Sequence, residues 1–297
     1  MTPFGNDDAI GFIGLGVMGS GMAHCLLRAG HRLHVHARKP QVLQAFADAG
    51  ATAAASPAAL GRSARLVFLC LSDAAAVEEV LFGPEGLSVG LAPGSCVVDT
   101  STIAAASARA FGERLRARGV SMLDGPVSGG QQGAVAGTLN TMIGGEADVV
   151  AACRAPMTAF CKTLTHVGPL GAGQTVKACN QVAVAGALLG VADAIALATA
   201  QGVDPAIMRE VLLAGTARSF ALEKHGQRII DADFAPGFRA VLMRKDLRIA
   251  LATAQDAGAA LQGAPVAEAL LDELVQGGQG ELDWSALGRL VQHKRKP

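Results

Sequence analysis

The sequence lacks an excess of either charge. Lysine plus arginine and aspartate plus glutamate both number 25, so the formal net charge is zero. A neutral chain offers no electrostatic basis for binding nucleic acid or an anionic membrane surface. We therefore expect neither nucleic acid nor a membrane among its partners.

The sequence also lacks the cysteine spacing of metal sites and redox motifs. No two of the six cysteines form a CxxC pair, and most lie in apolar runs (Cys25, Cys70, Cys96, Cys153, Cys161 and Cys179). This pattern predicts small buried side chains in a reducing compartment. His31, His34 and His36 cluster without a cysteine or carboxylate at metal-site spacing, so we predict no metal.

The sequence also predicts neither a secretory leader nor a membrane-spanning run. The longest uncharged stretch of the most apolar segment, residues 178–192, has 15 residues, and a bilayer requires roughly 20. No positive charge precedes the first apolar run, which is interrupted by glycines and so differs from a signal peptide. We expect a cytoplasmic protein.

The first recognisable pattern is a short apolar run, residues 9–14, that leads into GxGxxG and then into a helical pattern ending near Gly30. A strand, this glycine motif and a helix together predict a dinucleotide-binding turn. The first glycine permits the tight turn, the second lets the pyrophosphate approach, and the third lets the helix pack on the strand. The helix N-terminus attracts phosphate. The predicted cofactor-binding residues are Gly14, Leu15, Gly16, Val17, Met18 and Gly19.

Two cations follow the second predicted strand, residues 32–37. Arg38 and Lys39 stand where an NAD-selective site places an acid for the ribose, and no acid occurs between Asp8 and Asp48. Because a guanidinium pairs well with phosphate oxygens, we predict NADP as cofactor, with NAD as the alternative. An ordinary exposed turn is the structural alternative for these two residues.

Strand and helix patterns alternate as far as residue 168, and only helical patterns follow. The further strands are expected at 66–71, 96–99, 120–124, 139–143 and 163–167, and the later helices at 171–201, 204–214, 240–258, 265–276 and 283–293. We predict an α/β fold with a Rossmann-type, doubly wound parallel sheet, which binds ligands at the carboxyl ends of its strands. The predicted parts are a leader (1–8), an NAD(P)-binding domain (9–168) and an all-helical substrate and oligomerisation domain (169–297).

The long helix predicted over 171–201 carries the chemistry-bearing side chains. Lys177, Asn180 and Gln181 are spaced i, i+3 and i+4 and share one face of an otherwise apolar helix. An isolated buried ammonium is costly, so a lysine in this position indicates a function. The alternative is a lysine near the helix start that reaches solvent. Because the helix is apolar on most faces, we also expect a homodimer or homotetramer.

Four motifs in this order resemble those of the β-hydroxyacid dehydrogenases, over about residues 9–290. They span residues 11–19, 124–130 with 133–138, 171–180 and 245–247. The family includes 3-hydroxyisobutyrate dehydrogenases and 2-hydroxy-3-oxopropionate (tartronate semialdehyde) reductases. The Asn180–Gln181 pair looks more like the reductase branch. One departure is the loop after Thr102, which lacks the proline usual in the family.

The resemblance implies roles for individual residues. Lys177 would be catalytic, and the small substrate would be held by its carboxylate at Ser128, Gly129, Gly130 and Asn180. Backbone N–H groups of such a glycine loop can form an anion-binding nest. The residues implied to approach the nicotinamide side of the cofactor, or to close over it, are Leu71, Ser72, Thr102 and Lys245.

These observations predict an NADP-dependent oxidoreductase that interconverts a small 3-hydroxy acid and its semialdehyde, similar to 2-hydroxy-3-oxopropionate reductase. A 3-hydroxyisobutyrate dehydrogenase is the alternative within the family. An imine reductase shares the two-domain plan but usually lacks the lysine. A non-catalytic nucleotide-sensing scaffold is a further alternative, because a fold does not imply a function.

Overall fold

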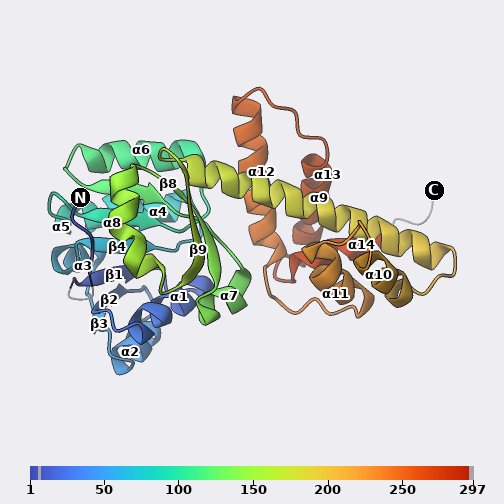
Figure 1. Cartoon of the computed structure of the whole chain (residues 1–297), viewed down its shortest axis with the longest axis horizontal. Coiled ribbons are helices and arrows are strands. Elements are labelled where there is room, and N and C mark those ends of the chain that lie inside the picture. Colours follow the sequence, from blue (N-terminus) through green and yellow to red (C-terminus); the bar gives the residue numbers. More distant parts are fainter. Residues whose placement is uncertain (6–7, 294–297) are drawn as a thin grey trace. The chain divides into compact units, whose positions relative to one another are not determined.

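The chain folds as two units that divide inside one long helix, α9 (Ala172–Ala200). The computed structural model describes residues 1–5 and 8–293. The N-terminal unit comprises Met1–Lys177 and the C-terminal unit begins at Ala178 (Figure 1). Each unit has its own hydrophobic core, so each is considered by itself.

Within the described residues, the strands of the N-terminal unit form one nine-stranded sheet. Their order is β3-β2-β1-β4-β5-β6-β8-β7, with β9 beside β8. The strands are β1 (Ile10–Ile13), β2 (Leu33–His36), β3 (Thr52–Ala53), β4 (Leu66–Leu69), β5 (Cys96–Asp99), β6 (Ser121–Asp124), β7 (Val127–Ser128), β8 (Leu139–Gly144) and β9 (Cys161–Gly168).

Helices cover both faces of the sheet, as Figure 1 shows for this unit. Along the strands, alternate residues enter different cores: Phe12 and Phe68 lie in one cluster, and Ile13 and Leu69 lie in the other. Burial on both faces explains the continuous apolar strands. The helices are α1 (Val17–Arg28), α2 (Pro40–Asp48), α3 (Pro57–Ser63), α4 (Ala74–Phe82), α5 (Leu87–Gly90), α6 (Ala105–Arg116), α7 (Gly130–Ala136) and α8 (Ala147–Met157).

The predicted α/β class is confirmed, but one edge of the sheet is antiparallel. The pairs among β1 to β6 are parallel, whereas β8 runs antiparallel to β6 and β7. The segment between β7 and β8, residues 129–138, has ten residues, and a parallel crossover needs about a dozen or more. The sheet is therefore mixed, a detail that the alternation of strands and helices did not predict.

The segment predicted as a leader is joined to this unit. The side chain of Phe4 is 2% exposed and belongs to the core that also contains Phe12. The Phe4 N–H donates to the carbonyl oxygen of Ala152 at 3.0 Å. Residues at the start of the described chain therefore contribute to the packing of the N-terminal unit.

The C-terminal unit is helical, as predicted. It contains the remainder of α9 and α10 (Pro205–Leu213), the π-helix η1 (Ala221–Gly226), α11 (Gln227–Ile230), α12 (Ala240–Asp256), α13 (Ala264–Gln276), the 3-10 helix η2 (Trp284–Ala286) and α14 (Leu287–His293). The sequence did not predict η1 and α11. Glycine and charged residues interrupt the apolar periodicity there, and Arg209 of α10 donates to the carbonyl oxygens of Leu222 and Glu223 in η1.

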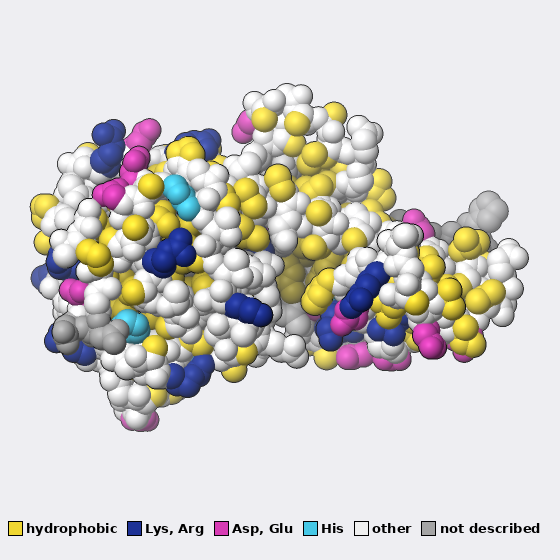
Figure 2. Space-filling view, viewed as in Figure 1, with side chains coloured by type: hydrophobic (Ala, Val, Ile, Leu, Met, Phe, Trp, Pro, Cys, Tyr) yellow, Lys and Arg dark blue, Asp and Glu magenta, His cyan; other side chains and the backbone are white. Residues whose placement is uncertain are grey.

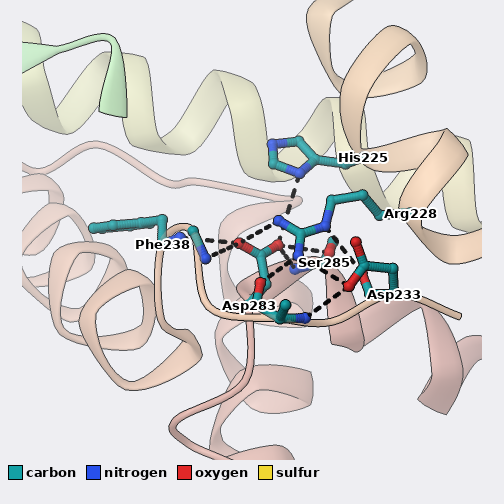
Figure 3. A network of polar contacts seen from close by, with 8 residues as sticks. His225, Arg228, Asp233, Phe238, Asp283 and Ser285 are labelled. Atoms are coloured by element: carbon teal, nitrogen blue, oxygen red, sulfur yellow. Dashed lines mark hydrogen bonds and ion pairs between the residues drawn. The ribbon is translucent and has the colours of Figure 1, made fainter. Parts of the chain in front are cut away.

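A buried carboxylate, Asp283, organises the loop before α12 (Figure 3). Its side chain is 1% exposed. One oxygen, Oδ2, accepts hydrogen bonds from the N–H groups of Gly237 (3.2 Å) and Phe238 (2.9 Å), and lies 3.2 Å from Nη1 of Arg228. The other oxygen accepts from the N–H and the hydroxyl of Ser285, at 3.0 and 2.6 Å. Asp283 therefore joins three segments of the unit.

His225 lies beside this network. Its Nδ1 is 3.8 Å from Oδ1 of Asp283, and its ring packs in a T-shaped arrangement with the rings of Phe220 and Trp284. Burial lowers the pKa of His225, although the charge of Asp283 opposes the shift. A neutral His225 at pH 7 leaves Arg228 as the cation that faces Asp283.

Hydrophobic side chains remain at the surface of the C-terminal unit (Figure 2). Leu197, Val203, Ile207 and Val211 are between 48% and 65% exposed. Among the described residues, α9 is the helix long and apolar enough to cross a bilayer, a property that core helices of soluble proteins share. The predicted homo-oligomer and the expected absence of a membrane partner stay predictions.

The cysteines differ in burial. Cys25, Cys96, Cys153 and Cys161 are buried, Cys70 is half-buried and Cys179 is exposed. The expectation of burial is therefore wrong for Cys179, because the side of α9 that carries it, with Thr175 and Val176, is exposed within this chain.

Candidate active site

The three glycines of the first motif satisfy three different constraints. Gly14, directly after β1, has a φ of +100°, and a Cβ there would lie 2.2 Å from the carbonyl oxygen of Cys70. A Cβ at Gly19 would lie 1.9 Å from the carbonyl oxygen of Gly14. At Gly16 a Cβ would meet no atom within 4 Å. The turn and the packing need Gly14 and Gly19, while the open space at Gly16 admits a ligand.

Helix α1 begins directly at this open space. Gly16 is its N-cap and provides no side-chain cap, and no acidic residue lies in the first turn. Val17 is 62% exposed, whereas Leu15 is buried and Met18 packs on the core. Uncapped N–H groups and the positive end of the helix dipole favour a phosphate at this position. The residues therefore fit the pyrophosphate of a dinucleotide.

Arg38 and Lys39 follow β2, and both are exposed. Neither side chain has a hydrogen bond or ion pair with the described part of the chain. Lys39 is the N-cap of α2, which has no side-chain cap and no acid in its first turn. Both cations are therefore available to an anionic ligand, as a ribose phosphate would require.

The sheet order places the glycine turn beside the end of β4. The order of strands reverses between β1 and β4, and ligands bind at such a switch point in open α/β sheets. Leu71 is half-buried there, and its N–H donates to Oγ of Ser101 at 2.8 Å. Ser72 is exposed and donates to Oδ2 of Asp73, whose other oxygen caps α4.

Thr102 lies in the loop that follows β5. It is half-buried between Ser101 and Ile103, both of which are buried. The N–H of Ser101 donates to Oδ1 of Asp99 at 2.9 Å. The side chain of Gln174 donates from Nε2 to the Ser101 carbonyl at 2.8 Å, and its Oε1 accepts from the Ile103 N–H at 3.1 Å. Hydrogen bonds thus hold this loop, which lacks the family's proline.

Lys177 lies next to the predicted substrate loop. Its side chain is 7% exposed, and Nζ donates to the carbonyl oxygen of Val127 at 3.0 Å. Val127 directly precedes Ser128, which is half-buried, and Gly129 and Gly130, which are exposed. Their φ values of +133° and +63° suit glycine. The structure therefore brings the lysine and this loop together, as the sequence suggested.

Asp124 fixes the start of the helix that carries Lys177, a role the sequence did not reveal. Its side chain is fully buried. Oδ1 accepts from the N–H of Gly171 and Oδ2 from the N–H of Gln174, both at 2.7 Å. Burial raises the pKa of Asp124, opposed by these hydrogen bonds and by the charge of Arg109. The carboxylate satisfies N–H groups that a helix start leaves unpaired.

The glycines around Asp124 explain the GAG sequence at the start of α9. A Cβ at Gly173 would lie 2.5 Å from the carbonyl oxygen of Met142, and Gly171 has a φ of +94°. A Cβ at Gly144 would lie 2.4 Å from Oδ1 of Asp124. The helix start can approach the sheet this closely only without side chains at these positions.

The remaining predicted residues belong to the C-terminal unit. Asn180 donates to Oε1 of Gln181 at 2.8 Å, and Gln181 donates from Nε2 to Oδ2 of Asp246 at 2.7 Å. Nζ of Lys245 lies 3.1 Å from Oδ1 of Asp246. Asn180 and Lys245 are thus linked through two buried side chains. Asp246 lies in the motif of residues 245–247, but its sequence context predicted no role for it.

Comparisons with known proteins agree with this arrangement. Residues 9–168 match the family described as the NAD binding domain of 6-phosphogluconate dehydrogenase, and residues 171–291 match that described as NAD-binding of NADP-dependent 3-hydroxyisobutyrate dehydrogenase. The chain is 37% identical over 278 residues to the 2-hydroxy-3-oxopropionate reductase of Escherichia coli (strain K12), covering 94% of this chain and 95% of that protein.

Two further relatives are similar over almost the whole chain. The NAD-dependent L-serine dehydrogenase of Pseudomonas aeruginosa is 36% identical over 288 residues, with 95% of this chain and 97% of that protein covered. The solved structure of Mycobacterium tuberculosis 3-hydroxyisobutyrate dehydrogenase with L-serine superimposes with a TM-score of 0.89 at 27% identity. That match covers 96% of this chain and 99% of the solved one.

A dinucleotide cradle on a Rossmann-type sheet, followed by a helical unit, defines a nicotinamide-dependent oxidoreductase of two-domain type. The chain belongs to the β-hydroxyacid dehydrogenase family and acts on a hydroxyl group with NADP or NAD as cofactor. This membership disfavours the nucleotide-sensing scaffold.

Proposed function

We propose that the protein is an NADP-dependent oxidoreductase that interconverts a small 3-hydroxy acid and its semialdehyde, with 2-hydroxy-3-oxopropionate as the substrate reduced. The observation that carries this proposal is the 3.0 Å contact of Lys177 Nζ with Val127, directly before Ser128, Gly129 and Gly130. A proton donor beside an anion-binding loop suits a carbonyl that lies a short distance from a carboxylate. The similarity to the Escherichia coli reductase supports the same substrate.

Lys177 is the acid and base of the proposed reaction. The nicotinamide, when bound, supplies the hydride in reduction and accepts it in oxidation. Lys177 donates a proton to the carbonyl oxygen as this becomes an alkoxide, and it accepts the hydroxyl proton in the reverse direction. An ammonium has three donors, so one N–H can stay on the Val127 carbonyl while another reaches the substrate.

The substrate carboxylate binds to the backbone N–H groups of the Ser128–Gly130 loop. Asn180 adds an amide, and its Nδ2 keeps a second hydrogen beside the bond to Gln181. Residues 14–19 hold the pyrophosphate of the cofactor, and Arg38 and Lys39 hold its 2′-phosphate. The residues assigned to the nicotinamide side, or to closing over the cofactor, are Leu71, Ser72, Thr102 and Lys245.

The preference for NADP is proposed from Arg38 and Lys39. The serine dehydrogenase relative is described as NAD-dependent at nearly the same identity as the reductase, so similarity alone does not choose between the cofactors. Two exposed cations after β2, without an acid in that turn, support the 2′-phosphate.

Initial rates with a substrate panel test the proposal. The panel contains 2-hydroxy-3-oxopropionate, the semialdehyde of 3-hydroxyisobutyrate, L-serine and a cyclic imine, each with NADP(H) and NAD(H). We expect the highest kcat/KM for 2-hydroxy-3-oxopropionate with NADPH. Its methyl ester should lose about 2 kcal/mol or more of transition-state stabilisation, because the N–H donors of the Ser128–Gly130 loop would lose their charged partner.

Other outcomes would replace the proposal. The highest rate with the semialdehyde of 3-hydroxyisobutyrate, or with L-serine, would move the protein to the branch of the corresponding relative. Equal rates for the ester, or for simple aldehydes, would show that the Ser128–Gly130 loop does not bind a carboxylate.

We also propose a cytoplasmic homodimer or homotetramer that assembles through the C-terminal unit. The exposed apolar side chains Leu197, Val203, Ile207 and Val211 support this assembly. Light scattering at micromolar concentration tests it, and a monomeric mass would contradict it.

A further inference from the structure

A buried amide, Gln174, connects the cofactor loop to the helix of the catalytic lysine. Gln174 is 2% exposed, and both polar atoms of its side chain are hydrogen-bonded. The partners are the carbonyl of Ser101 and the N–H of Ile103, on either side of Thr102. A single side chain therefore fixes the two peptide groups that flank Thr102 in position.

The backbone of the same residue is held by Asp124. Oδ2 of Asp124 accepts the Gln174 N–H, and Oδ1 accepts the Gly171 N–H, both at 2.7 Å. Gln174 is three residues before Lys177 in α9, so the two side chains leave the helix on the same face, one turn apart. Gln174 therefore connects the loop after β5 directly to the helix of Lys177, without intervening side chains.

The connection continues to the end of β4. Ser101 accepts the Leu71 N–H through its hydroxyl and the Gln174 amide through its carbonyl. Ser101 itself is oriented by Oδ1 of Asp99. Hydrogen bonds thus link the loops after β4 and β5, and the last residue of β6, to the first turn of α9, and each contact lies within the N-terminal unit.

We infer that Gln174 is a positioning residue that holds the loop around Thr102 at a fixed distance from Lys177. This inference rests on the proposed function, because the proposed function assigns Thr102 to the nicotinamide side and Lys177 to proton transfer. Hydride and proton then reach the same carbonyl group only if the loop and the helix keep their spacing. A displacement of about 1 Å in such a site can cost roughly 10²-fold in rate.

Two substitutions separate the two hydrogen bonds of Gln174. Gln174→Leu has nearly the same volume and removes both. Gln174→Glu keeps the acceptor for the Ile103 N–H, but an ionised carboxylate cannot donate to the Ser101 carbonyl. The matched control is Thr175→Val, the next residue in α9, which is exposed and loses only a hydroxyl bond to the Gly171 carbonyl.

The first readout is hydrogen exchange of the Ile103 amide in the protein without cofactor or substrate. We expect faster exchange in Gln174→Leu, because the acceptor of the Ile103 N–H is removed. In Thr175→Val we expect the wild-type rate. The second readout is kinetic. In Gln174→Leu, kcat should fall roughly 10- to 100-fold, while the dissociation constant for NADPH changes less than about threefold because the phosphate contacts are intact.

Gln174→Glu keeps the test decisive if the leucine variant does not fold. The ratio of its kcat to that of the wild type should rise as the pH falls, since a protonated glutamate regains a donor for Ser101. A flat ratio, wild-type exchange at Ile103 in the leucine variant, or wild-type kcat in that variant would each overturn the inference. Failure of the wild type on every substrate would instead refute the proposed function, and the exchange experiment would still decide whether Gln174 holds the loop.

Discussion

Asp124 in the N-terminal unit and Asp283 in the C-terminal unit are both buried carboxylates, but they hold different kinds of structure. Asp124 accepts two N–H groups at the first turn of α9, the helix that carries Lys177. Asp283 accepts four hydrogen bonds from a loop and a short helix, and faces the guanidinium of Arg228. One carboxylate supports a reacting group, and the other closes a loop of a helical core.

The difference shows that burial and hydrogen bonding alone do not identify a functional carboxylate. Asp124 has no ion pair among the described residues, and burial raises its pKa, which shows an unfavourable environment for its charge. Asp283 has a cation at 3.2 Å and four donors. We expect substitutions around Asp124 to act on turnover and substitutions around Asp283 to act on stability.

The largest expected effect is on the chemistry at Lys177. Lys177→Ala should lower kcat by roughly 10²–10⁴, because the proton donor is lost, while NADPH affinity stays close to that of the wild type. Lys177→Arg should fail as well, since a guanidinium does not release its proton near neutral pH. Steady-state kinetics and cofactor titration check this. Retention of more than a tenth of wild-type kcat by the alanine variant would exclude the acid and base role.

The next effect concerns stability at Asp283. Asp283→Ala should lower the free energy of unfolding by about 3 kcal/mol, because it leaves Arg228 and several N–H groups without their acceptor. Chemical denaturation measures this change. Glu281→Ala is the matched control, since its ion pair with Arg239 is exposed and should contribute less than about 1 kcal/mol. Equal losses in the two variants would show that burial of Asp283 adds nothing.

A smaller effect is expected on cofactor selection. Arg38→Ala should weaken NADPH binding by about 1.5–3 kcal/mol, roughly tenfold or more, through loss of a charge-assisted phosphate contact. NADH binding should hardly change, because NADH has no 2′-phosphate. Fluorescence titration of both cofactors tests the prediction. Equal weakening of both would indicate a structural role for Arg38, and a wild-type preference for NADH would contradict the proposed NADP specificity.

The smallest effect is the pH dependence contributed by His225. Burial lowers its pKa from the ordinary value of 6.5, so the unfolded chain takes up a proton at a higher pH than the folded one. The stability is therefore full above about pH 6.5 and falls as the pH drops toward the lowered pKa, by at most about 1.4 kcal/mol per pH unit for one group.

A ring substitution isolates this contribution. His225→Phe keeps an aromatic ring against Phe220 and Trp284 but cannot be protonated. Denaturation at pH 7.5 and pH 5.5 should show a smaller acid-induced loss of stability in the variant than in the wild type. Because His31 and His34 are present in both proteins, the difference reports His225. The same loss in both proteins would show that His225 does not titrate differently in the folded state.

Local patterns were sufficient to predict the class of the fold. The GxGxxG turn, the apolar strands and the change to helical patterns after residue 168 each depend on backbone geometry over a few residues. The antiparallel edge was missed, since it depends on how the short segment 129–138 returns to the sheet. Helix η1 was missed because its apolar periodicity is weak, and its carbonyl oxygens at Leu222 and Glu223 are bonded by Arg209 of another helix.

The proposed site was predicted to a similar extent. Lys177, Asn180 and the Ser128–Gly130 loop could be selected because residue type, spacing and the resemblance coincide in short motifs. Asp124, Gln174 and Asp246 lay inside the same motifs, but no role followed from their spacing. An aspartate before a glycine and a glutamine near a helix start have many ordinary explanations, so neither carried a signal of its own.

The sequence by itself determined where the glycine turn, the cation pair and the lysine-bearing helix occur, because steric limits on glycine and the periods of strands and helices act within a few residues. Only the tertiary structure decided which distant groups meet. Gln174 contacts Ser101 across 73 positions, and Asp124 contacts the α9 start across 47 and 50 positions. Such contacts follow from the packing of the first turn of α9 against the sheet, where glycines allow close approach and buried N–H groups require acceptors.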